Sequence, residues 1–162
     1  MNIVPATIAD AAAILNLQKL AYQSEARIYN DDRIPPLTQT LEEIEKEFAD
    51  LVFLKAMTDD GALVGSVRAR ERDGTCFIGR LIVHPDHQGR GIGAELMKAI
   101  ESRFAHAKRF ELFTGHKSER NLRFYRKLGY QAFEEEQVTG SLRLVFLQKE
   151  NSSRRGERRH GT

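Results

Sequence analysis

The sequence contains a single cysteine, Cys76, and no run of apolar residues that approaches the ~18 needed to span a bilayer as a helix. One cysteine excludes an internal disulfide and predicts a reducing compartment, the cytoplasm. The N-terminus lacks the charged region and apolar core of a secretory signal. Cys76 begins the apolar run Cys76-Phe77-Ile78, which favours a small buried strand residue over a nucleophile.

An excess of charge is also missing, because the formal net charge is only +2. Residues 151–162 contain four arginines and one glutamate and contribute +3, which leaves a body of about −1. We therefore predict one domain over residues 1–150, followed by a basic, disordered tail over 151–162. Since the body has no basic excess, we expect no nucleic-acid partner.

Hydrophobic periodicity and turn residues predict a mixed α/β fold. Pro35 and Pro36 exclude a helix in the segment that joins the first two helices. Asp-Gly turns at residues 60–61 and 73–74 make three successive strands antiparallel neighbours. The expected order is β-α-α-β-β-β-α-β-α-β-β, a mixed, mostly antiparallel sheet with helices on both faces. The expected strands are 3–4, 51–57, 63–70, 76–83, 109–114, 130–137 and 142–149, and the expected helices are about 8–29, 41–48, 92–104 and 118–128.

The most informative segment is Gln88-Gly89-Arg90-Gly91-Ile92-Gly93, between a predicted strand and a predicted helix. Glycines leave backbone N–H groups uncovered, and a helix N-terminus favours an anion such as a pyrophosphate. Ala94-Glu95 excludes a P-loop, which needs Lys-Ser or Lys-Thr there. The dinucleotide fingerprint fits literally, with Glu111 about 20 residues downstream of the loop, but the preceding strand belongs to an antiparallel meander.

The residues around this loop carry a family resemblance. Val83-His84-Pro85 precedes the glycine loop, and Asn121, Tyr125 and Gly129-Tyr130 follow it at a characteristic spacing. Together these motifs resemble the GNAT superfamily of CoA-dependent N-acetyltransferases, and the element order extends the resemblance over about residues 2–149. The resemblance implies acetyl-CoA as co-substrate, with no metal, and an acceptor that is the primary amine of a small molecule or a peptide.

The resemblance also implies site residues. The pantetheine arm is expected along Leu81, Ile82 and Val83, and the remaining cofactor-binding residues are expected to be Gln88, Gly89, Arg90, Gly91, Ile92, Gly93 and Asn121. Tyr125 is the predicted general acid, because a phenol stays protonated at neutral pH and could protonate the departing thiolate.

A base is needed for the incoming amine, but the glutamate that many relatives carry on the strand before the loop is Gly79 here. Glu111 is our predicted base, since its strand should lie beside the cofactor strand; Glu71, His116, Glu25 and a water chain are alternatives. Tyr22, Glu25 and Tyr29 are expected to line the acceptor site. Two other functions stay open, a non-catalytic acetyl-CoA sensor and a dinucleotide-binding module, and the protein could form a homodimer.

Overall fold

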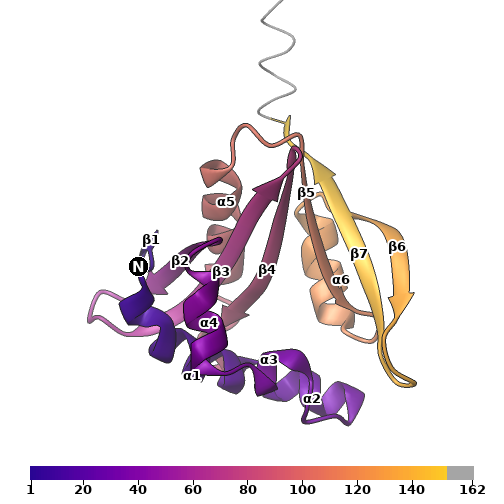
Figure 1. The fold of residues 1–162 in the computed structure, drawn as a ribbon, viewed down its shortest axis with the longest axis horizontal. Coiled ribbons are helices and arrows are strands. Elements are labelled where there is room, and N and C mark those ends of the chain that lie inside the picture. The colour runs from indigo at the N-terminus through magenta and orange to yellow at the C-terminus, as the bar shows by residue number, and fades with distance from the viewer. Residues whose placement is uncertain (153–162) are drawn as a thin grey trace, which may run out of the picture.

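Seven strands form one sheet in the computed structural model, which describes residues 1–152 (Figure 1). The strand order is β1-β2-β3-β4-β5-β7-β6, and every neighbouring pair is antiparallel except β4 and β5. The expected mostly antiparallel sheet is therefore confirmed, and the single parallel pair is not the parallel βαβαβ unit of a dinucleotide fold. The strands are β1 (Asn2–Pro5), β2 (Val52–Met57), β3 (Leu63–Arg72), β4 (Thr75–Val83), β5 (Arg109–Gly115), β6 (Gln131–Gln137) and β7 (Arg143–Glu150).

Helices cover both faces of the sheet, as expected. On one face, α5 packs Leu96 and Ile100 against Val67 and Ala69 of β3 in the main hydrophobic core. On the other face, α1 and α4 bury Ile14 and Ile44 with Phe53 of β2. The helices are η1 (Ile8–Asp10), α1 (Ala11–Ala21), α2 (Gln23–Tyr29), α3 (Pro35–Thr38), α4 (Leu41–Glu47), η2 (Pro85–His87), α5 (Ile92–Arg103) and α6 (Glu119–Lys127).

One predicted feature of the N-terminal half is wrong. Pro35 and Pro36 do not exclude a helix; they begin the short helix α3, at positions where the missing N–H has no intrahelical partner. The first expected helix is also divided, because the chain bends at Tyr22 between α1 and α2. A capping box of Thr40 and Glu43, the pattern that the local sequence Thr-Leu-Glu-Glu favours, begins α4.

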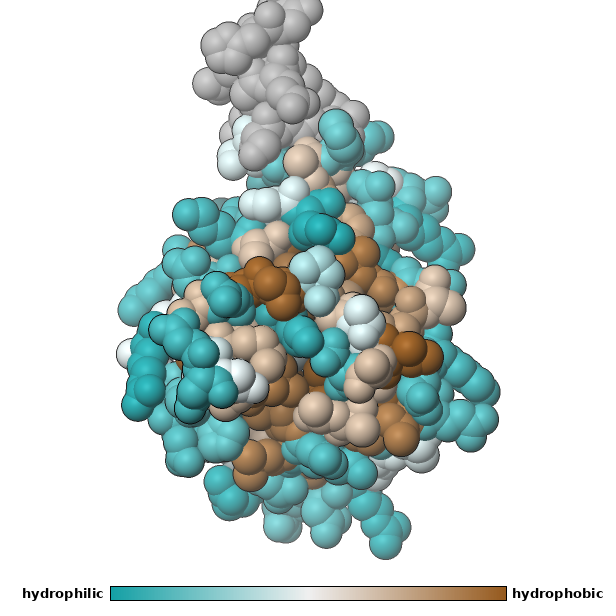
Figure 2. Space-filling model, turned by 90° about the vertical axis from the view of Figure 1, so that its left-hand side faces the viewer, coloured by the Kyte–Doolittle hydropathy of each residue, from teal (hydrophilic) through white to brown (hydrophobic). Residues whose placement is uncertain are grey.

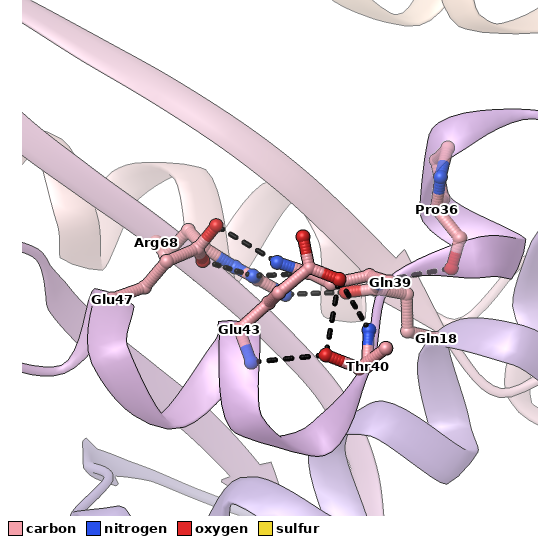
Figure 3. A network of polar contacts seen from close by, with 7 residues as sticks. All are labelled: Gln18, Pro36, Gln39, Thr40, Glu43, Glu47 and Arg68. Atoms are coloured by element: carbon pink, nitrogen blue, oxygen red, sulfur yellow. Dashed lines mark hydrogen bonds and ion pairs between the residues drawn. The ribbon is translucent and has the colours of Figure 1, made fainter.

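A buried arginine ties these short helices to the sheet (Figure 3). Arg68 of β3 is 2% exposed, forms an ion pair with Glu47 of α4, and donates to Gln18 of α1. Gln18 in turn donates to the carbonyl oxygen of Pro36 at 2.9 Å. The network, which also includes Gln39, fixes α3 relative to the sheet. The sequence showed Arg68 as one of three alternating polar residues and gave no sign of its burial.

The C-terminal end of the domain extends past the predicted boundary at residue 150. Asn151 is 6% exposed, and its side-chain amide donates to the carbonyl oxygens of Ala105 and Ala107 at 2.8 Å each. Asn151 therefore belongs to the folded domain. Residues 153–162, most of the predicted tail, lie outside the described residues.

The surface on the β1 side carries apolar side chains in the middle of the view, surrounded by hydrophilic ones (Figure 2). Val4 and Ile8 of the N-terminal segment are 39% and 56% exposed. None of the helices within residues 1–152 is long and apolar enough to cross a membrane.

Candidate active site

A cavity of about 310 Å³ opens where β4 and β5 separate. The two strands pair only from Thr75 to Phe77 on β4, opposite Arg109 to Glu111 on β5. Beyond that point residues 78–83 of β4 and 112–115 of β5 line the cavity from its two sides. The segment from α1 to α3, α6 and the β6–β7 connection complete the lining. The cavity is thus made by the only parallel pair among the described strands.

The cavity wall of β4 contains a β-bulge. Arg68 of β3 lies opposite Gly79 and Ser66 lies opposite Ile82, so β4 has one residue more than β3 over this interval. Arg80 has φ of 50°, a left-handed conformation that is uncommon for a residue with a side chain. Leu81, Ile82 and Val83, the predicted pantetheine residues, all line the cavity after the bulge. No feature of the local sequence indicated the conformation of Arg80.

The glycine loop presents a run of free backbone amides. No described residue accepts a hydrogen bond from the N–H groups of residues 88–94, and the first paired amide of α5 is that of Glu95, which donates to Gly91. Gly89 and Gly91 have φ of 78° and 80°, so both need the left-handed freedom of glycine. Arg120 of α6 donates to the Gln88 side chain at 2.9 Å, so the loop has a second cation in addition to Arg90. The loop can therefore hold a pyrophosphate.

Gly93 serves close packing and has an ordinary φ. A Cβ at this position would lie 3.3 Å from the Phe124 ring, so the glycine lets α5 approach α6 closely. Tyr125, the next residue of α6, lines the cavity. Burial raises the pKa of its phenol, and Tyr22 and Glu25 raise it further. The Tyr125 hydroxyl is therefore a neutral donor throughout the physiological pH range.

The three residues predicted for the acceptor site, Tyr22, Glu25 and Tyr29, all line the same cavity. Burial raises the pKa of Tyr22, and the positive charge of Arg80 partly offsets this. Tyr29 is 5% exposed, and its hydroxyl lies 2.8 Å from the Ser118 hydroxyl while it accepts from the Lys117 amide at 3.0 Å. The Tyr29 hydroxyl is thus occupied within the protein.

Glu25 connects α2 with α6 through two hydrogen bonds. Ser118 donates to one carboxylate oxygen at 2.5 Å, and Asn121 donates to the other at 3.3 Å. Asn121, predicted to bind the cofactor, also donates to Thr114 of β5 at 3.3 Å. Ser118 stands at the N-cap of α6, but its side chain makes no capping bond. No local pattern predicted the contact between Glu25 and Ser118, because the two residues are 93 positions apart.

Glu111, the predicted base, lies apart from these residues. Its strand does pair with β4, as expected, but Glu111 is opposite Phe77, where the two strands are still together. The carboxylate accepts from Arg109 at 3.4 Å, and Glu111 is not among the cavity-lining residues. Among the described residues, no group of three or more His, Cys, Asp or Glu side chains is placed to hold a metal ion.

Comparison with known proteins gives a consistent result. The family model described as Acetyltransferase (GNAT) family matches residues 12–130. The UPF0157 protein YqkA of Bacillus subtilis is 28% identical over 124 residues, which is 76% of this chain and 35% of that protein. This chain thus spans about a third of the length of that relative.

Solved structures match over nearly the whole chain. The structure of smu.2055 from Streptococcus mutans has a TM-score of 0.80 at 15% identity and covers 93% of this chain and 99% of its own. The PaiA N-acetyltransferase from Thermoplasma acidophilum, solved in complex with coenzyme A, has a TM-score of 0.75 at 20% identity with the same coverage. At these identities the likeness concerns the fold.

Proposed function

Because the chain belongs to the GNAT acetyltransferase family, we propose that it transfers an acetyl group from acetyl-CoA to the primary amine of a small molecule or a peptide. The structure of a CoA complex among the neighbours supports acetyl-CoA as the co-substrate. The primary-amine acceptor, the cytoplasmic location and a homodimer stay predictions.

The observation that carries this proposal is the position of the free amides beside the cavity. The loop with the unpaired N–H groups of residues 88–94 directly follows the β4 residues that line the cavity, and Gln88 belongs to both. A pyrophosphate at the loop would direct the attached pantetheine arm along Leu81, Ile82 and Val83. Such an arm is rich in amide groups, which suit an unpaired strand edge.

Tyr125 is the proposed general acid. Amine attack on the thioester forms a C–N bond and breaks the C–S bond, and the departing thiolate needs a proton. Tyr125 lines the cavity and keeps its proton at neutral pH, because burial raises its pKa. The neutral phenol can therefore donate to the sulfur as the negative charge develops there.

The experiment is an acetyl-CoA binding measurement combined with an acetyl-transfer assay over polyamines, amino acids, aminoglycosides and peptides. Arg90→Glu should weaken CoA binding by roughly 5- to 30-fold, since it reverses a charge beside the N-terminus of α5. Lys98→Glu makes the same change of charge on an exposed residue of the same helix, away from the loop, and should bind CoA as the wild type does.

The outcome of this experiment distinguishes the acetyltransferase from the acetyl-CoA sensor and the dinucleotide-binding module. Binding of acetyl-CoA with transfer to an amine supports the proposal. Binding without transfer to any amine favours the sensor function. A thermal shift with NAD and none with acetyl-CoA would contradict the proposal.

A further inference from the structure

We propose that Glu25 is the general base of this transfer, and that it receives the acceptor as an ammonium ion before taking its proton. The inference rests on the proposed acetyltransferase function and adds to it the group that activates the amine. The β4 position at which many relatives carry a glutamate base is Gly79 here, which has no side chain, so in this proposal the base comes from α2 instead.

The first support is the distribution of carboxylates around the cavity. Among the described residues that line it, Glu25 is the only Asp or Glu. Gly79 also lines the cavity, and a Cβ built there would meet no atom within 4 Å. The space beside the β4 bulge is thus free, and the acidic group reaches the cavity from α2.

The second support is the direction of the hydrogen bonds around Glu25. The Lys117 amide donates to the Tyr29 oxygen at 3.0 Å. The Glu25 carboxylate can only accept, so the single Ser118 proton is committed to it and the Tyr29 proton must point to the Ser118 oxygen. Ser118 then donates its own proton to Glu25. This series of hydrogen bonds ends at the Glu25 carboxylate, which accepts. Together with the bond from Asn121, it holds the Glu25 side chain in one orientation.

The second lone pair of each Glu25 oxygen is left for a ligand. Each carboxylate oxygen can accept about two hydrogen bonds, and each oxygen of Glu25 accepts one from the described residues. An ammonium group offers three donors and a positive charge, which suit these free positions. The acceptor class is therefore a cationic primary amine.

The charged and titratable groups around Glu25 allow this assignment. Arg80 faces the cavity from β4, Tyr125 from α6, Tyr29 from α2, and Tyr22 from the bend between α1 and α2. His116 lies next to Tyr29, with 5.9 Å between the ring centroids. Both Glu25 and Tyr22 contribute to the raised pKa of Tyr125, so the proposed base and the proposed acid lie within electrostatic range of each other.

The proton balance follows from these two groups. The ammonium gives its first proton to Glu25, which passes it to solvent, and the neutral nitrogen attacks the thioester carbon. The C–N bond forms, the C–S bond breaks, and Tyr125 gives its proton to the thiolate. The nitrogen then loses a second proton, which restores Tyr125. One amide, one free thiol and one released proton result.

The test is Glu25→Gln, with Glu45→Gln on α4 as the matched control, since Glu45 is exposed and outside the cavity. We expect kcat/KM for the amine to fall by at least about 100-fold in Glu25→Gln, the low end for loss of a general base. CoA affinity should stay at the wild-type value, which also shows that the variant is folded. Below the pKa of the amine, the rate of Glu25→Gln should rise about tenfold per pH unit, because only the free amine reacts.

The decisive variant adds Gly79→Glu to Glu25→Gln. A carboxylate at residue 79 can enter the free space beside the bulge. We expect the double variant to have a kcat/KM at least about tenfold above that of Glu25→Gln, and a flatter pH profile. If Glu25→Gln does not fold, Ser118→Ala serves instead. It removes the hydrogen bond that orients Glu25 and should raise KM for the amine without changing CoA affinity.

The outcomes distinguish this inference from the proposed function. An inactive wild type that accepts no amine overturns the proposed function, and this inference with it. An active wild type whose Glu25→Gln variant keeps its kcat/KM and its pH profile overturns only the role of Glu25. The role of Glu25 as a base is also overturned if Glu25→Gln loses activity but keeps the pH profile of the wild type, and if adding Gly79→Glu does not restore that activity.

Discussion

The hydroxyl of Tyr29 occupies the place that a side chain on Gly115 would need. A Cβ at Gly115 would lie 1.9 Å from the Tyr29 oxygen and 2.5 Å from the ring carbon that carries it. Gly115 is the last residue of β5, and Tyr29 is the last residue of α2. Because Gly115 has no side chain, the Tyr29 ring can pack directly on β5 and hold α2 against the sheet. The same tyrosine then bonds Ser118, which holds Glu25.

We predict that Gly115→Ala lowers the free energy of unfolding by about 1–3 kcal/mol, the usual cost of overpacking a buried site. The methyl group must displace the Tyr29 ring and break its bond to Ser118. Gly140→Ala is the control, because a Cβ there meets no atom within 4 Å and its φ lies outside the left-handed region. Denaturant titration of both variants measures the difference; equal stability would contradict the close approach.

Breaking the Arg68–Glu47 pair should be costly. Glu47→Ala leaves a buried guanidinium without its carboxylate, and we expect a loss of about 3 kcal/mol, near the low end for a buried pair. The low end applies because the Glu47 side chain is 32% exposed while that of Arg68 is 3% exposed. Thermal or chemical unfolding provides the measurement.

The double variant Arg68→Met/Glu47→Leu provides the comparison for that prediction. Replacing both members of a buried pair with apolar residues often restores stability. The new methionine side chain would lie beside Phe53, whose ring centroid is now 4.6 Å from the guanidinium carbon. We expect the double variant to be more stable than Glu47→Ala. A double variant that is less stable than Glu47→Ala would show that the network, beyond the charge pair, holds α3 and α4.

Tyr125→Phe should lower kcat by roughly 100-fold or more, because it removes the proposed proton donor and leaves the ring. Tyr130→Phe is the matched control: its hydroxyl donates to Glu101 at 2.7 Å, and Tyr130 does not line the cavity. The control should lose about 1 kcal/mol of stability and keep its kcat. If chemistry is rate-limiting and Tyr125→Phe keeps the wild-type kcat, Tyr125 is not the general acid and serves only as a packed aromatic residue.

Cys76 should make stability depend on alkaline pH. Burial raises the pKa of its thiol from 9.0 to about 12, and Glu71 and Glu101 add to this. The unfolded thiol ionises first, so the native state binds one proton more between these values, and stability falls as pH rises. Below about pH 8.5 this contribution is fully present.

The wild type should therefore lose about 1.5–2 kcal/mol more than Cys76→Ala between pH 8 and pH 10, because the tyrosines contribute equally to both proteins and the difference comes from the thiol. Denaturant titrations of both proteins at the two pH values give the comparison. Parallel pH dependence of the two proteins would contradict a buried, protonated thiol.

Local sequence patterns were enough to predict most of the secondary structure. The capping box at Thr40 and the Asp73-Gly74 turn are present, and both residues of that turn have positive φ, as a tight hairpin requires. Cys76 is fully buried on its strand. These features depend on residues within a few positions of one another, so the sequence carries their signal.

The glycine loop, too, was determined locally, since Gly89 and Gly91 adopt the conformations that only glycine takes up readily. The site around it was not. The contact of Glu25 with Ser118 and the separation of Glu111 from the cavity depend on how α2, α6 and the parallel strand pair come together in space.

The sequence by itself thus determined the order of the strands, the antiparallel hairpins and the conformation of the glycine loop, because turn, capping and glycine conformations are short-range. Only the tertiary structure decided which carboxylate enters the cavity. Glu25 and Glu111 are both acidic residues with plausible positions along the chain. The divergence of β4 and β5 beyond Phe77 opens the cavity away from Glu111, and the bend at Tyr22 brings Glu25 to it.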